Sequence, residues 1–563
     1  MINLKINGRP VSVPEGSTIL EAAKAADVVV PTLCFLKEIS DAGACRVCVV
    51  EVKGADRLVA ACNTPAAEGM EVETDTERVR ETRKRNVQLI LANHDCRCLE
   101  CSRNGKCRLQ SLARDMGLLE DTTYPKKVAK DRWDASLPFI RRDSKCISCL
   151  RCVNVCSKVQ TMDVWDLAGL GRTAKVCVRG GKSLSDAGCV YCGQCVANCP
   201  VAALDERDDT RRFTEAIYDP SKTVVMQVAP AVRAAWAEDL GLSPEVATEG
   251  RMVAAFRRLG VKYVFDTCFG ADITVMEEAS ELLEGIGERK MPLFTSCCPG
   301  WVRFLKHEYP DMVRCLSSSK SPQLMFGGAV KSAFAEKIGK KPEDMFCVSV
   351  MPCIAKKWES TMTNDVDLVL TTREAAALVA RFGIDAATLK ESPFDSPFGF
   401  GSGAAVIFGA SGGVMEAALR TAHFLATGKN PDPDAFKIVR GSAGRREVVA
   451  EIAGREVRAC VASGLANARQ VVEDVRSGKT RYDFVEIMAC PGGCARGGGQ
   501  PFCEATETVS RRSDALYSID SARDVRFSHD NPDVKALYDG FFGAPLSPKA
   551  REILHTDQSA WQL

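Results

Sequence analysis

Two cysteine runs of identical spacing restrict the possible folds of this chain more than any other feature. Both follow the pattern C-x2-C-x2-C-x3-C, one within residues 146–156 and the other within residues 189–199. Their members are Cys146, Cys149, Cys152, Cys156, Cys189, Cys192, Cys195 and Cys199. Three thiolates from one tight loop fit three corners of an iron–sulfur cubane, and the remote fourth cysteine joins the two halves. Two [4Fe–4S] clusters are therefore expected, with structural zinc and chance spacing as the alternatives.

Composition excludes several classes of protein. The chain has 27 cysteines among 563 residues, and its first residues, MINLKINGRP, lack the charged-then-apolar build of a secretory signal, which argues against a secreted disulfide scaffold. A net charge of +1 gives no electrostatic reason to bind nucleic acid or an anionic membrane. No apolar run approaches the roughly 18 residues that a membrane span needs. We expect a cytoplasmic protein of several domains whose clustered cysteines bind metal.

A further cysteine group lies near the N-terminus. Cys34, Cys45, Cys48 and Cys62 are spaced C-x10-C-x2-C-x13-C. This resembles the plant-type [2Fe–2S] pattern, with a first gap longer than the usual four residues. A [2Fe–2S] cluster is favoured over a zinc site.

The segment HDCRCLECSRNGKC is ambiguous by its spacing alone. It offers His94, Cys98, Cys101 and Cys107, and Cys96 is a rival for one ligand position. The histidine could equally hold zinc, but an iron–sulfur cluster is favoured. Four clusters in one chain would pass single electrons, and the remaining sequence must then supply the end point of that path.

The pattern of apolar residues predicts a β-rich start and an α/β second half. INLKING alternates apolar and polar residues, and Thr18 and Glu21 form a capping box before the helical segment ILEAAKAA. Beyond about residue 215, strand-like runs alternate with helical segments such as REAAALVARF, which favours parallel sheet. The expected strands are TVVMQVA, KYVFDT, MPLFTS, MFCVSVMP, VDLVLTT and YDFVEIMA. Sites in such sheets lie beyond the carboxyl ends of strands, where Cys298, Cys353 and Cys490 stand.

Three segments of the second half resemble the signatures of the [FeFe]-hydrogenases. They are TSCCPGW, MPCIAKKWE and EIMACPGGCARGGGQP, and both FDTCFGADITVMEEASE and GASGGVMEAALR are also similar to the family's pattern. The tail, SHDNPDVKALYDGFFGAP to EILHT, resembles a part that forms a separate small subunit in some members. The resemblance covers nearly the whole chain, and it implies the reversible conversion of two protons and two electrons into H2.

The resemblance also implies an α+β multidomain architecture. An N-terminal β-grasp [2Fe–2S] ferredoxin-like module and a His/Cys [4Fe–4S] module precede a two-cluster ferredoxin-like module, in which the fourth cysteine of each run ligates the other run's cluster. An α/β H-cluster domain with parallel sheets follows. The expected ranges are 1–77, 78–123, 136–210, 220–503 for the catalytic domain, and 504–563 for the small-subunit-like tail.

The family's H-cluster joins a [4Fe–4S] cubane to a two-iron unit that carries CO, cyanide and a dithiolate bridge. By motif position its expected ligands are Cys298, Cys353, Cys490 and Cys494, of which Cys494 bridges the two parts. Soft thiolates suit such a cluster, and the flanking glycines would let the backbone approach it closely. Cys297 resembles the family's thiol relay. A thiol can serve in this role, because its ordinary pKa near 8.5 lets it shuttle protons near neutral pH.

Other roles are carried over by the same resemblance. Protons would continue from Cys297 through Glu278, Ser317 and Glu281; without the family, an acidic pair such as Glu277 and Glu278 would simply indicate a solvated helix face. Lys356 would set its cation beside a cyanide ligand, or else pair with Glu359. Residues expected to line the two-iron unit are Ala229, Pro230, Gln323, Met351 and Met488.

Three positions depart from the family pattern, and one assignment becomes firmer. Ala231 stands where some members have serine, Ile354 where threonine is common, and Gly285 where some members place an arginine near the proton exit. The resemblance also raises His94 to the expected ligand of an N-terminal [4Fe–4S] cluster. The expected cofactors are therefore one [2Fe–2S] cluster, three accessory [4Fe–4S] clusters and the H-cluster.

The partners at the outer end of the electron path are less closely defined. No G-x-G-x-x-G motif opens a βαβ unit, so no nucleotide or flavin site is expected in the chain itself. Either flavin- and NAD(P)-binding and ferredoxin-like subunits or soluble ferredoxin would exchange its electrons, and maturation proteins would build the two-iron unit. The rival functions are a non-catalytic iron–sulfur subunit and a hydrogen sensor or iron–sulfur assembly relative; the intact signatures favour the enzyme.

Overall fold

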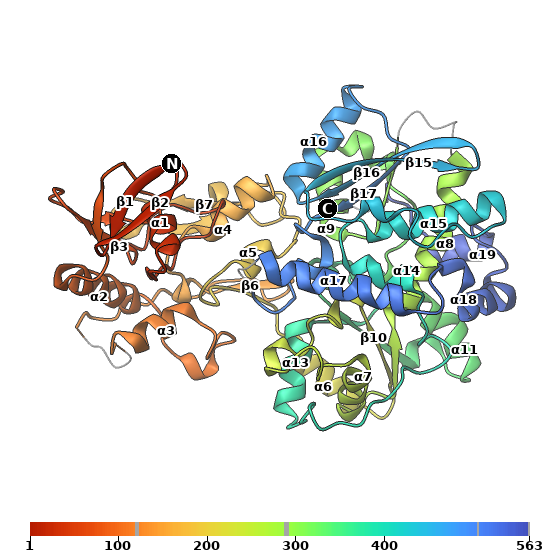
Figure 1. Cartoon of the computed structure of the whole chain (residues 1–563). Coiled ribbons are helices and arrows are strands. Elements are labelled where there is room, and N and C mark those ends of the chain that lie inside the picture. Colours follow the sequence, from red (N-terminus) through yellow and green to blue (C-terminus); the bar gives the residue numbers. More distant parts are fainter. Residues whose placement is uncertain (119–122, 286–291, 504–505, 561–563) are drawn as a thin grey trace. The chain divides into compact units, whose positions relative to one another are not determined.

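The computed structural model describes the chain except residues 119–122, 286–291, 504–505 and 561–563 (Figure 1). It divides into two units, residues 1–187 with 198–205 and residues 188–197 with 206–563. The division passes through the second ferredoxin-like cysteine run, because the segment 188–197 belongs to the second unit and Cys199 to the first. The predicted boundary before the tail falls on residues 504–505, outside the described residues.

The first unit begins with the small β-rich module that the alternating sequence predicts. Its five-stranded sheet has the order β2-β1-β5-β3-β4. The strands are β1 (Ile2–Ile6), β2 (Arg9–Val13), β3 (Val49–Val52), β4 (Val59–Ala60) and β5 (Glu71–Glu73). Helix α1 (Ile19–Ala25) starts at the predicted capping box, in which Glu21 N–H donates to Thr18 Oγ1 and Thr18 N–H donates to Glu21 Oε2. Buried Leu4, Ile6 and Ile19 join the sheet and helix in one core.

The rest of the first unit is short elements around the cysteine loops. The helices are α2 (Glu77–Ala92), α3 (Arg108–Asp115) and α4 (Arg151–Asn154). The strands are β6 (Phe139–Arg141), β7 (Trp165–Ala168), β8 (Lys175–Val178) and β9 (Leu204–Glu206). Trp133, Phe139 and Trp165 form an aromatic cluster with ring centroids 5.8–6.4 Å apart. This cluster supplies a local core where the cysteine loops leave little regular structure.

The second unit contains two sheets, and the predicted parallel strands are confirmed. One sheet is all parallel, in the order β11-β10-β13-β14, and the other has the order β12-β17-β16-β15. The strands are β10 (Thr223–Val228), β11 (Tyr263–Asp266), β12 (Leu293–Phe294), β13 (Met345–Met351), β14 (Leu368–Thr371), β15 (Arg445–Ile452), β16 (Arg455–Ser463) and β17 (Phe484–Met488). The antiparallel β15–β16 hairpin was not predicted from the sequence, and its alternation of buried and exposed residues on β15 fits a half-solvated edge.

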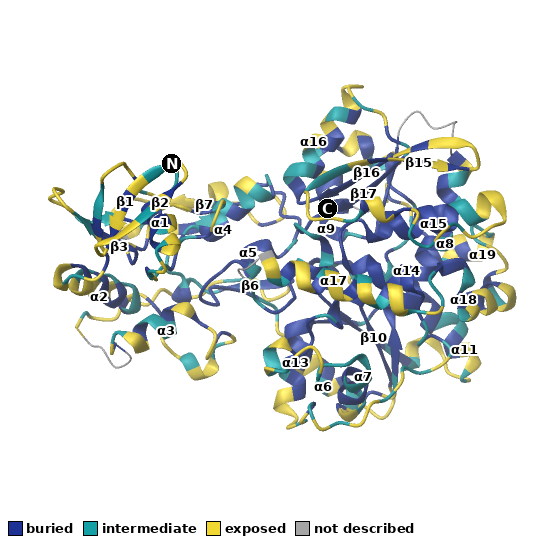
Figure 2. Ribbon diagram, in the orientation of Figure 1, coloured by how far each residue is buried: buried dark blue, intermediate teal, exposed yellow. Residues whose placement is uncertain are grey.

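Helices cover both sheets. They are α5 (Gln194–Ala197), α6 (Thr210–Tyr218), α7 (Glu249–Arg258), α8 (Thr267–Gly285), α9 (Pro299–Glu308), α10 (Pro322–Ala329), α11 (Ala335–Lys337), α12 (Ala355–Glu359), α13 (Thr372–Arg381), α14 (Gly403–Val406), α15 (Gly413–Thr427) and α16 (Leu465–Arg476). Helix α8 contacts α10 and α15 and is dark over almost its full length in Figure 2. Glu277 and Glu278 on it are completely buried, so the interpretation of this acidic pair as a solvated face is wrong.

The tail packs into the second unit rather than forming a core of its own. Its helices are α17 (Thr506–Ala522), α18 (Pro532–Leu537) and α19 (Pro548–Leu554). Leu516 joins the cluster around α14, and Tyr538 and Leu554 join an aromatic core with Phe265 and Phe398. Within the described residues, no helix combines the length and the apolar character needed to cross a lipid bilayer.

Candidate active site

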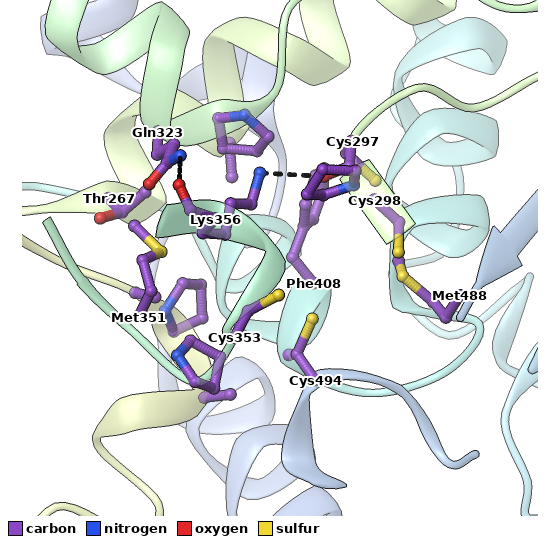
Figure 3. Close-up of a pocket in the computed structure, with 18 residues that line it drawn as sticks. Thr267, Cys297, Cys298, Gln323, Met351, Cys353, Lys356, Phe408, Met488 and Cys494 are labelled. Atoms are coloured by element: carbon purple, nitrogen blue, oxygen red, sulfur yellow. Dashed lines mark hydrogen bonds between the residues drawn. The ribbon is translucent and has the colours of Figure 1, made fainter. Parts of the chain in front are cut away.

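A cavity in the second unit lies where strands of both sheets end. Cys298 follows β12, Cys353 follows β13 and Cys494 follows β17, and all three line the cavity (Figure 3). The volume of the cavity is about 80 Å³. It is also lined by the predicted residues Ala229, Pro230, Gln323, Met351, Lys356, Met488 and Cys297, and by Ala231. Sites beyond the carboxyl ends of parallel strands are the expectation for this fold class, and the three signatures meet here.

The buried cavity disfavours the ionisation of free thiols, and a bound soft metal would favour it. Burial raises the pKa of Cys353 to about 12, and the neighbouring charge of Cys298 adds to this rise. Burial likewise raises the pKa of Cys490, to which the charges of Cys353, Cys298 and Cys494 contribute. These thiols are close enough to disfavour one another's ionisation, whereas a coordinated metal reverses that preference. Four buried sulfur donors therefore fit an iron–sulfur cubane.

Glycines bring the backbone segments of this site into contact. A Cβ on Gly497 would lie 2.0 Å from the Pro352 carbonyl oxygen, and a Cβ on Gly498 would lie 2.8 Å from Gly193 Cα. Gly492, at φ +79°, adopts the left-handed conformation that favours glycine. The glycine-rich run after Cys490 thus packs against the Cys353 segment and against the loop 188–197.

Cys297 occupies the side of the cavity nearest the buried acids. Cys297 is buried, with 8% of the residue exposed. Lys356 Nζ donates to its carbonyl oxygen at 3.1 Å (Figure 3). Burial raises the pKa of the Cys297 thiol, and the charge of Glu278 raises it further. Burial also raises the pKa of Glu278 to about 8, although the Ser296 N–H donates to its Oε1. Both groups therefore carry protons at neutral pH.

A second acidic group continues this line. Ser317 Oγ donates to Glu281 Oε2 at 2.7 Å, and the Ser318 N–H donates to Glu281 Oε1 at 3.2 Å. Glu281 and Glu278 lie one helical turn apart on α8, and the charge of Glu281 contributes to the raised pKa of Glu278. The structure thus brings all four predicted proton-path residues, Cys297 included, to one side of α8.

Lys356 forms an ion pair with Glu359, which was the predicted alternative to a cyanide ligand. Its Nζ lies 2.9 Å from Glu359 Oε2 while the side chain lines the cavity. Burial alone would lower the pKa of Lys356, but the Glu359 carboxylate and the nearby thiols raise it overall, so the lysine is cationic. Gln323 Nε2 donates to the same carboxylate at 2.6 Å, and Gln323 Oε1 has no hydrogen-bond partner among the described residues. A buried amide oxygen without a partner is one mark of a site that holds a further group.

Several lining residues were not singled out from the sequence. Thr267, Pro322 and Phe408 line the cavity beside the predicted set. Thr267 directly follows β11, so the strand-end rule used for the cysteines could have found it. Phe408 lies in a short turn after α14, for which neither periodicity nor a chemical side chain gave a signal.

The N-terminal cysteines also converge. In the β-rich module, hydrogen bonds from the thiols of Cys45 and Cys62 lower the pKa of Cys34, and Cys62 bonds Cys48 as well. These contacts link the four sulfurs in series, and such a set of four thiols suits a [2Fe–2S] cluster. They equally have the soft-donor chemistry of zinc, so the donor set alone does not choose between the two metals.

The histidine group forms a second small cavity in the first unit. His94, Cys96, Cys98 and Cys107 line it, and burial lowers the pKa of His94 to about 4, so the imidazole is neutral. Its Nδ1 lies 3.0 Å from the Lys145 carbonyl oxygen and must donate to it, which leaves the Nε2 lone pair for a metal. Cys101 lies close enough to Cys98 to contribute to its raised pKa, after burial and Cys96.

Cys96 differs from its neighbours. It is exposed, its thiol lies 3.3 Å from the His94 carbonyl oxygen, and Lys126 Nζ approaches its sulfur at 3.4 Å. Its sulfur is thus engaged with a backbone group and an ammonium group.

The two ferredoxin-like runs differ in their surroundings. Burial and the charge of Cys199 raise the pKa of Cys149 to about 12, so the fourth cysteine of the second run lies beside the first run. In the second unit, the Cys490 sulfur lies 4.0 Å from the Cys192 carbonyl oxygen. A candidate cubane ligand therefore touches the backbone of a candidate accessory-cluster ligand.

Comparisons with known proteins agree with this geometry. Residues 222–498 match the family described as iron only hydrogenase large subunit, C-terminal domain, and residues 506–559 match iron hydrogenase small subunit. The preceding matches are to a 2Fe-2S iron-sulfur cluster binding domain (1–77), the NADH-ubiquinone oxidoreductase-G iron-sulfur binding region (83–121) and a 4Fe-4S dicluster domain (145–216).

Full-length relatives decide the family. The chain is 44% identical to the NADP-reducing hydrogenase subunit HndD of Solidesulfovibrio fructosivorans, over 99% of this chain and 98% of that one. The chain belongs to the [FeFe]-hydrogenase family. It is also 36% identical to iron hydrogenase 1 of Clostridium pasteurianum over 99% of both chains. A solved variant of the [FeFe]-hydrogenase HydA1 from Chlamydomonas reinhardtii shares 40% identity, with a TM-score of 0.56 over 62% of this chain and 98% of that one.

The resemblance seen in the three signatures is thus confirmed. This [FeFe]-hydrogenase is an enzyme that interconverts H2 with protons and electrons, and iron–sulfur clusters of the [2Fe–2S] and [4Fe–4S] types relay the electrons. The non-catalytic and sensor alternatives are not favoured, because HndD and iron hydrogenase 1, which each match 99% of this chain, are named as hydrogenases.

Proposed function

We propose that this hydrogenase is the catalytic subunit of a cytoplasmic NAD(P)-linked enzyme, whose flavin- and NAD(P)-binding and ferredoxin-like partner subunits exchange its electrons. Full-length similarity to a subunit named NADP-reducing supports this, as does a sequence without G-x-G-x-x-G. A reducing compartment suits its many thiols. Soluble ferredoxin is the second candidate, because ferredoxin-linked members share this domain order.

The accessory clusters are assigned by their donor sets. We assign a [2Fe–2S] cluster to the β-rich module and three accessory [4Fe–4S] clusters to the histidine group and the two runs. The proposed ligands are Cys34, Cys45, Cys48 and Cys62; His94, Cys98, Cys101 and Cys107; Cys146, Cys149, Cys152 and Cys199; and Cys189, Cys192, Cys195 and Cys156. The tautomer of His94, fixed by the Lys145 carbonyl, supports its place in the second set.

The H-cluster is assigned to the cavity of the second unit. Cys298, Cys353, Cys490 and Cys494 would hold its cubane, with Cys494 as the bridge to the two-iron unit, which maturation proteins must supply. When bound, the cluster supplies the redox-active iron at which protons and electrons are joined or separated. Lys356 would offer its cation to a cyanide ligand while Glu359 keeps that cation in place.

The chain's own residues would move the protons. Cys297 is the group next to a proposed ligand, and its raised pKa keeps the proton on sulfur until a base removes it. Glu278 has a pKa of about 8, close to neutral pH, where acid–base transfer is most efficient. Ser317 and Glu281 then pass the proton outward through their 2.7 Å hydrogen bond.

The remaining lining residues would shape and shield the two-iron unit. Met351 and Met488 contribute apolar, polarisable side chains, and Ala229 and Pro230 form the start of a short turn after β10. The unpartnered Oε1 of Gln323 would face a further group, since its amide nitrogen is already engaged by Glu359.

The observation that carries this proposal is that Cys297, Glu278, Ser317 and Glu281 succeed one another on one side of α8. The test compares wild type with Cys297→Ala after anaerobic maturation, measuring H2 evolution from reduced methyl viologen. Loss of a proton-transfer group costs roughly 10²-fold or more in rate. We expect a loss of that size, with unchanged iron content.

A matched control is Cys460→Ala, because Cys460 is also buried but lies in β16, outside the cavity lining. Its rate should stay near that of wild type. A Cys297→Ala rate equal to that of the control would contradict the relay. For the acceptor, the native complex should reduce NADP+ with H2; if it reduces only ferredoxin, the second candidate takes its place.

A further inference from the structure

The proton path has a side branch that reaches into the C-terminal tail. Ser318 lies next to Ser317, and its hydroxyl is 3.4 Å from Glu281 Oε1 and 2.8 Å from His555 Nδ1. The other ring nitrogen, His555 Nε2, lies 2.9 Å from Glu277 Oε2. A hydrogen-bonded line therefore runs from Glu281 through Ser318 and His555 to Glu277.

The protons of this line can be assigned from its ends. Glu277 accepts hydrogen bonds from Tyr538 at Oε1 and from the Leu546 N–H at Oε2, as a carboxylate does. His555 Nε2 therefore donates to Glu277, and a neutral imidazole keeps Nδ1 as an acceptor for the Ser318 hydroxyl. When the Ser318 hydroxyl instead donates to Glu281, Nδ1 must carry a proton and the ring is an imidazolium.

These two arrangements differ by one transferred proton. A protonated Glu281 gives its proton to Ser318 Oγ while the Ser318 proton passes to His555 Nδ1. One O–H bond breaks at Glu281, one N–H bond forms at His555, and Ser318 ends with a hydroxyl as before. No electron moves, Glu281 becomes a carboxylate, and the Glu277 carboxylate stabilises the new imidazolium.

The fold holds His555 in place from the backbone. The Thr556 N–H donates to the Ser318 carbonyl at 2.8 Å, and the Lys320 N–H donates to the Leu554 carbonyl at 2.8 Å. His555 is 8% exposed, and Glu277 is fully buried. The titratable groups nearest the His555 imidazole are Glu277, which it contacts, Glu281 on the far side of Ser318, and Tyr538 on the far side of Glu277. Lys320 Nζ, in the segment paired with His555, is engaged by Asp365 and the Ile553 carbonyl.

We propose that His555 is a positioning and proton-accepting residue of the hydrogenase reaction, which takes protons from Glu281 through Ser318 with Glu277 as its counter-ion. Gly285, one turn beyond Glu281 on α8, has no side chain to receive that proton. The tail supplies the acceptor instead. This inference rests on the proposed path through Ser317 and Glu281.

The test uses the matured full-length enzyme and measures H2 evolution from reduced methyl viologen over a range of pH, together with the solvent isotope effect. The variants are His555→Gln, Glu277→Gln and Glu281→Gln. His423→Gln is the matched control, because His423 lies on α15 outside this line. Melting temperatures show whether each variant remains folded.

We expect the rates of His555→Gln and Glu277→Gln to fall roughly tenfold. Proton transfer should not be lost completely, because Glu281 is itself 9% exposed and can still exchange protons with solvent. The isotope effect should rise, and the shape of the pH–rate profile should change. His423→Gln should match wild type. Glu281→Gln should lose more rate than His555→Gln.

Other outcomes separate the two proposals. If Glu281→Gln keeps the wild-type rate, the path itself fails and this inference falls with it. If Glu281→Gln loses activity but His555→Gln behaves like the control, only the role of His555 is overturned. An equal loss at every pH with an unchanged isotope effect would mark His555 as structural and would also overturn the proposal.

Discussion

Glu278, a member of the proposed proton path, shows how burial changes the acid–base properties of one side chain. It is fully enclosed by protein, and its Oε2 accepts no hydrogen bond among the described residues. Burial raises its pKa from 4.5 to about 8. A carboxyl group with this pKa beside Cys297 can release its proton and take up another within the working range of pH, which an ordinary surface glutamate cannot do.

Replacement by glutamine should separate the proton from the shape of the side chain. Glu278→Gln is expected to lower H2 evolution roughly 10²-fold or more, because an amide cannot release a proton to its neighbour. The infrared band of a protonated carboxyl group at neutral pH should be lost from the variant. A variant with wild-type activity would exclude Glu278 from the path.

The same substitution should change how stability depends on pH. Between pH 4.5 and about 8 the unfolded carboxyl has released its proton while the folded one still holds it, so the wild-type free energy of unfolding falls as pH rises. Glu278→Gln lacks this fall and should gain stability relative to wild type towards pH 8. Chemical denaturation at several pH values measures the difference.

The sequence could predict which residues meet at the site, but only by resemblance. Without the resemblance, Glu277 and Glu278 would be assigned to a solvated helix face, because acidic residues on a helix are usually exposed. Helix α8 breaks this rule since it is covered by α10, α15 and the tail, and partners distant in sequence, such as Tyr538 and His555, satisfy Glu277. Lys356 shows the opposite case, where both predicted environments, the cavity and Glu359, are present together.

At the scale of elements, Arg303 makes one of the contacts that hold the loop 188–197 in the second unit. The Arg303 guanidinium, on α9, donates to the Cys189 carbonyl at 3.2 and 3.1 Å. It packs against the rings of both Tyr191 and Trp358, 4.4 and 4.3 Å from their centroids. One side chain therefore joins the cysteine loop to α9 and α12.

Removing this contact should loosen the loop. Arg303→Ala loses two charged hydrogen bonds and a buried cation–π stack, worth about 3 kcal/mol together. We expect a less stable accessory cluster, seen as fewer iron atoms per chain and a weaker reduced-cluster signal in electron paramagnetic resonance. Arg303→Lys keeps the charge without the planar stack and should be intermediate. Full iron content in Arg303→Ala would show that the loop is held by other contacts.

The strands of the second unit were predictable because each is a short apolar run bounded by turn residues. The loop 188–197 was not, since its spacing assigned it to the ferredoxin-like module and only tertiary contacts place it with the second unit. The hairpin of β15 and β16 was missed for a different reason. Its charged, exposed positions on β15, such as Glu447 and Glu451, weaken the apolar signal that marks buried strands.

At the scale of the whole chain, the tail behaves as a subunit that is covalently attached. Its Asp520 is fully buried and pairs with Arg420 at 3.0 Å, and also with Arg440 and Arg526. Tyr538 and Leu554 bury apolar surface in the core that contains Phe265. The matched small-subunit family covers residues 506–559, which is the same part of the chain.

These contacts predict that the covalent link is dispensable. Residues 1–503 and 506–563, produced together as two polypeptides, should form a stable one-to-one complex that evolves H2 once matured. Residues 1–503 alone should aggregate, because the aromatic core around Phe265 and Phe398 would be exposed. Asp520→Asn should weaken the complex by about 3 kcal/mol, since it removes a fully buried carboxylate that Arg420, Arg440 and Arg526 share. Lys535→Ala, which removes only a surface ion pair with Asp530, is the control and should bind normally. Soluble, active residues 1–503 without the tail would refute this account of the tail, because the core would then be complete without it.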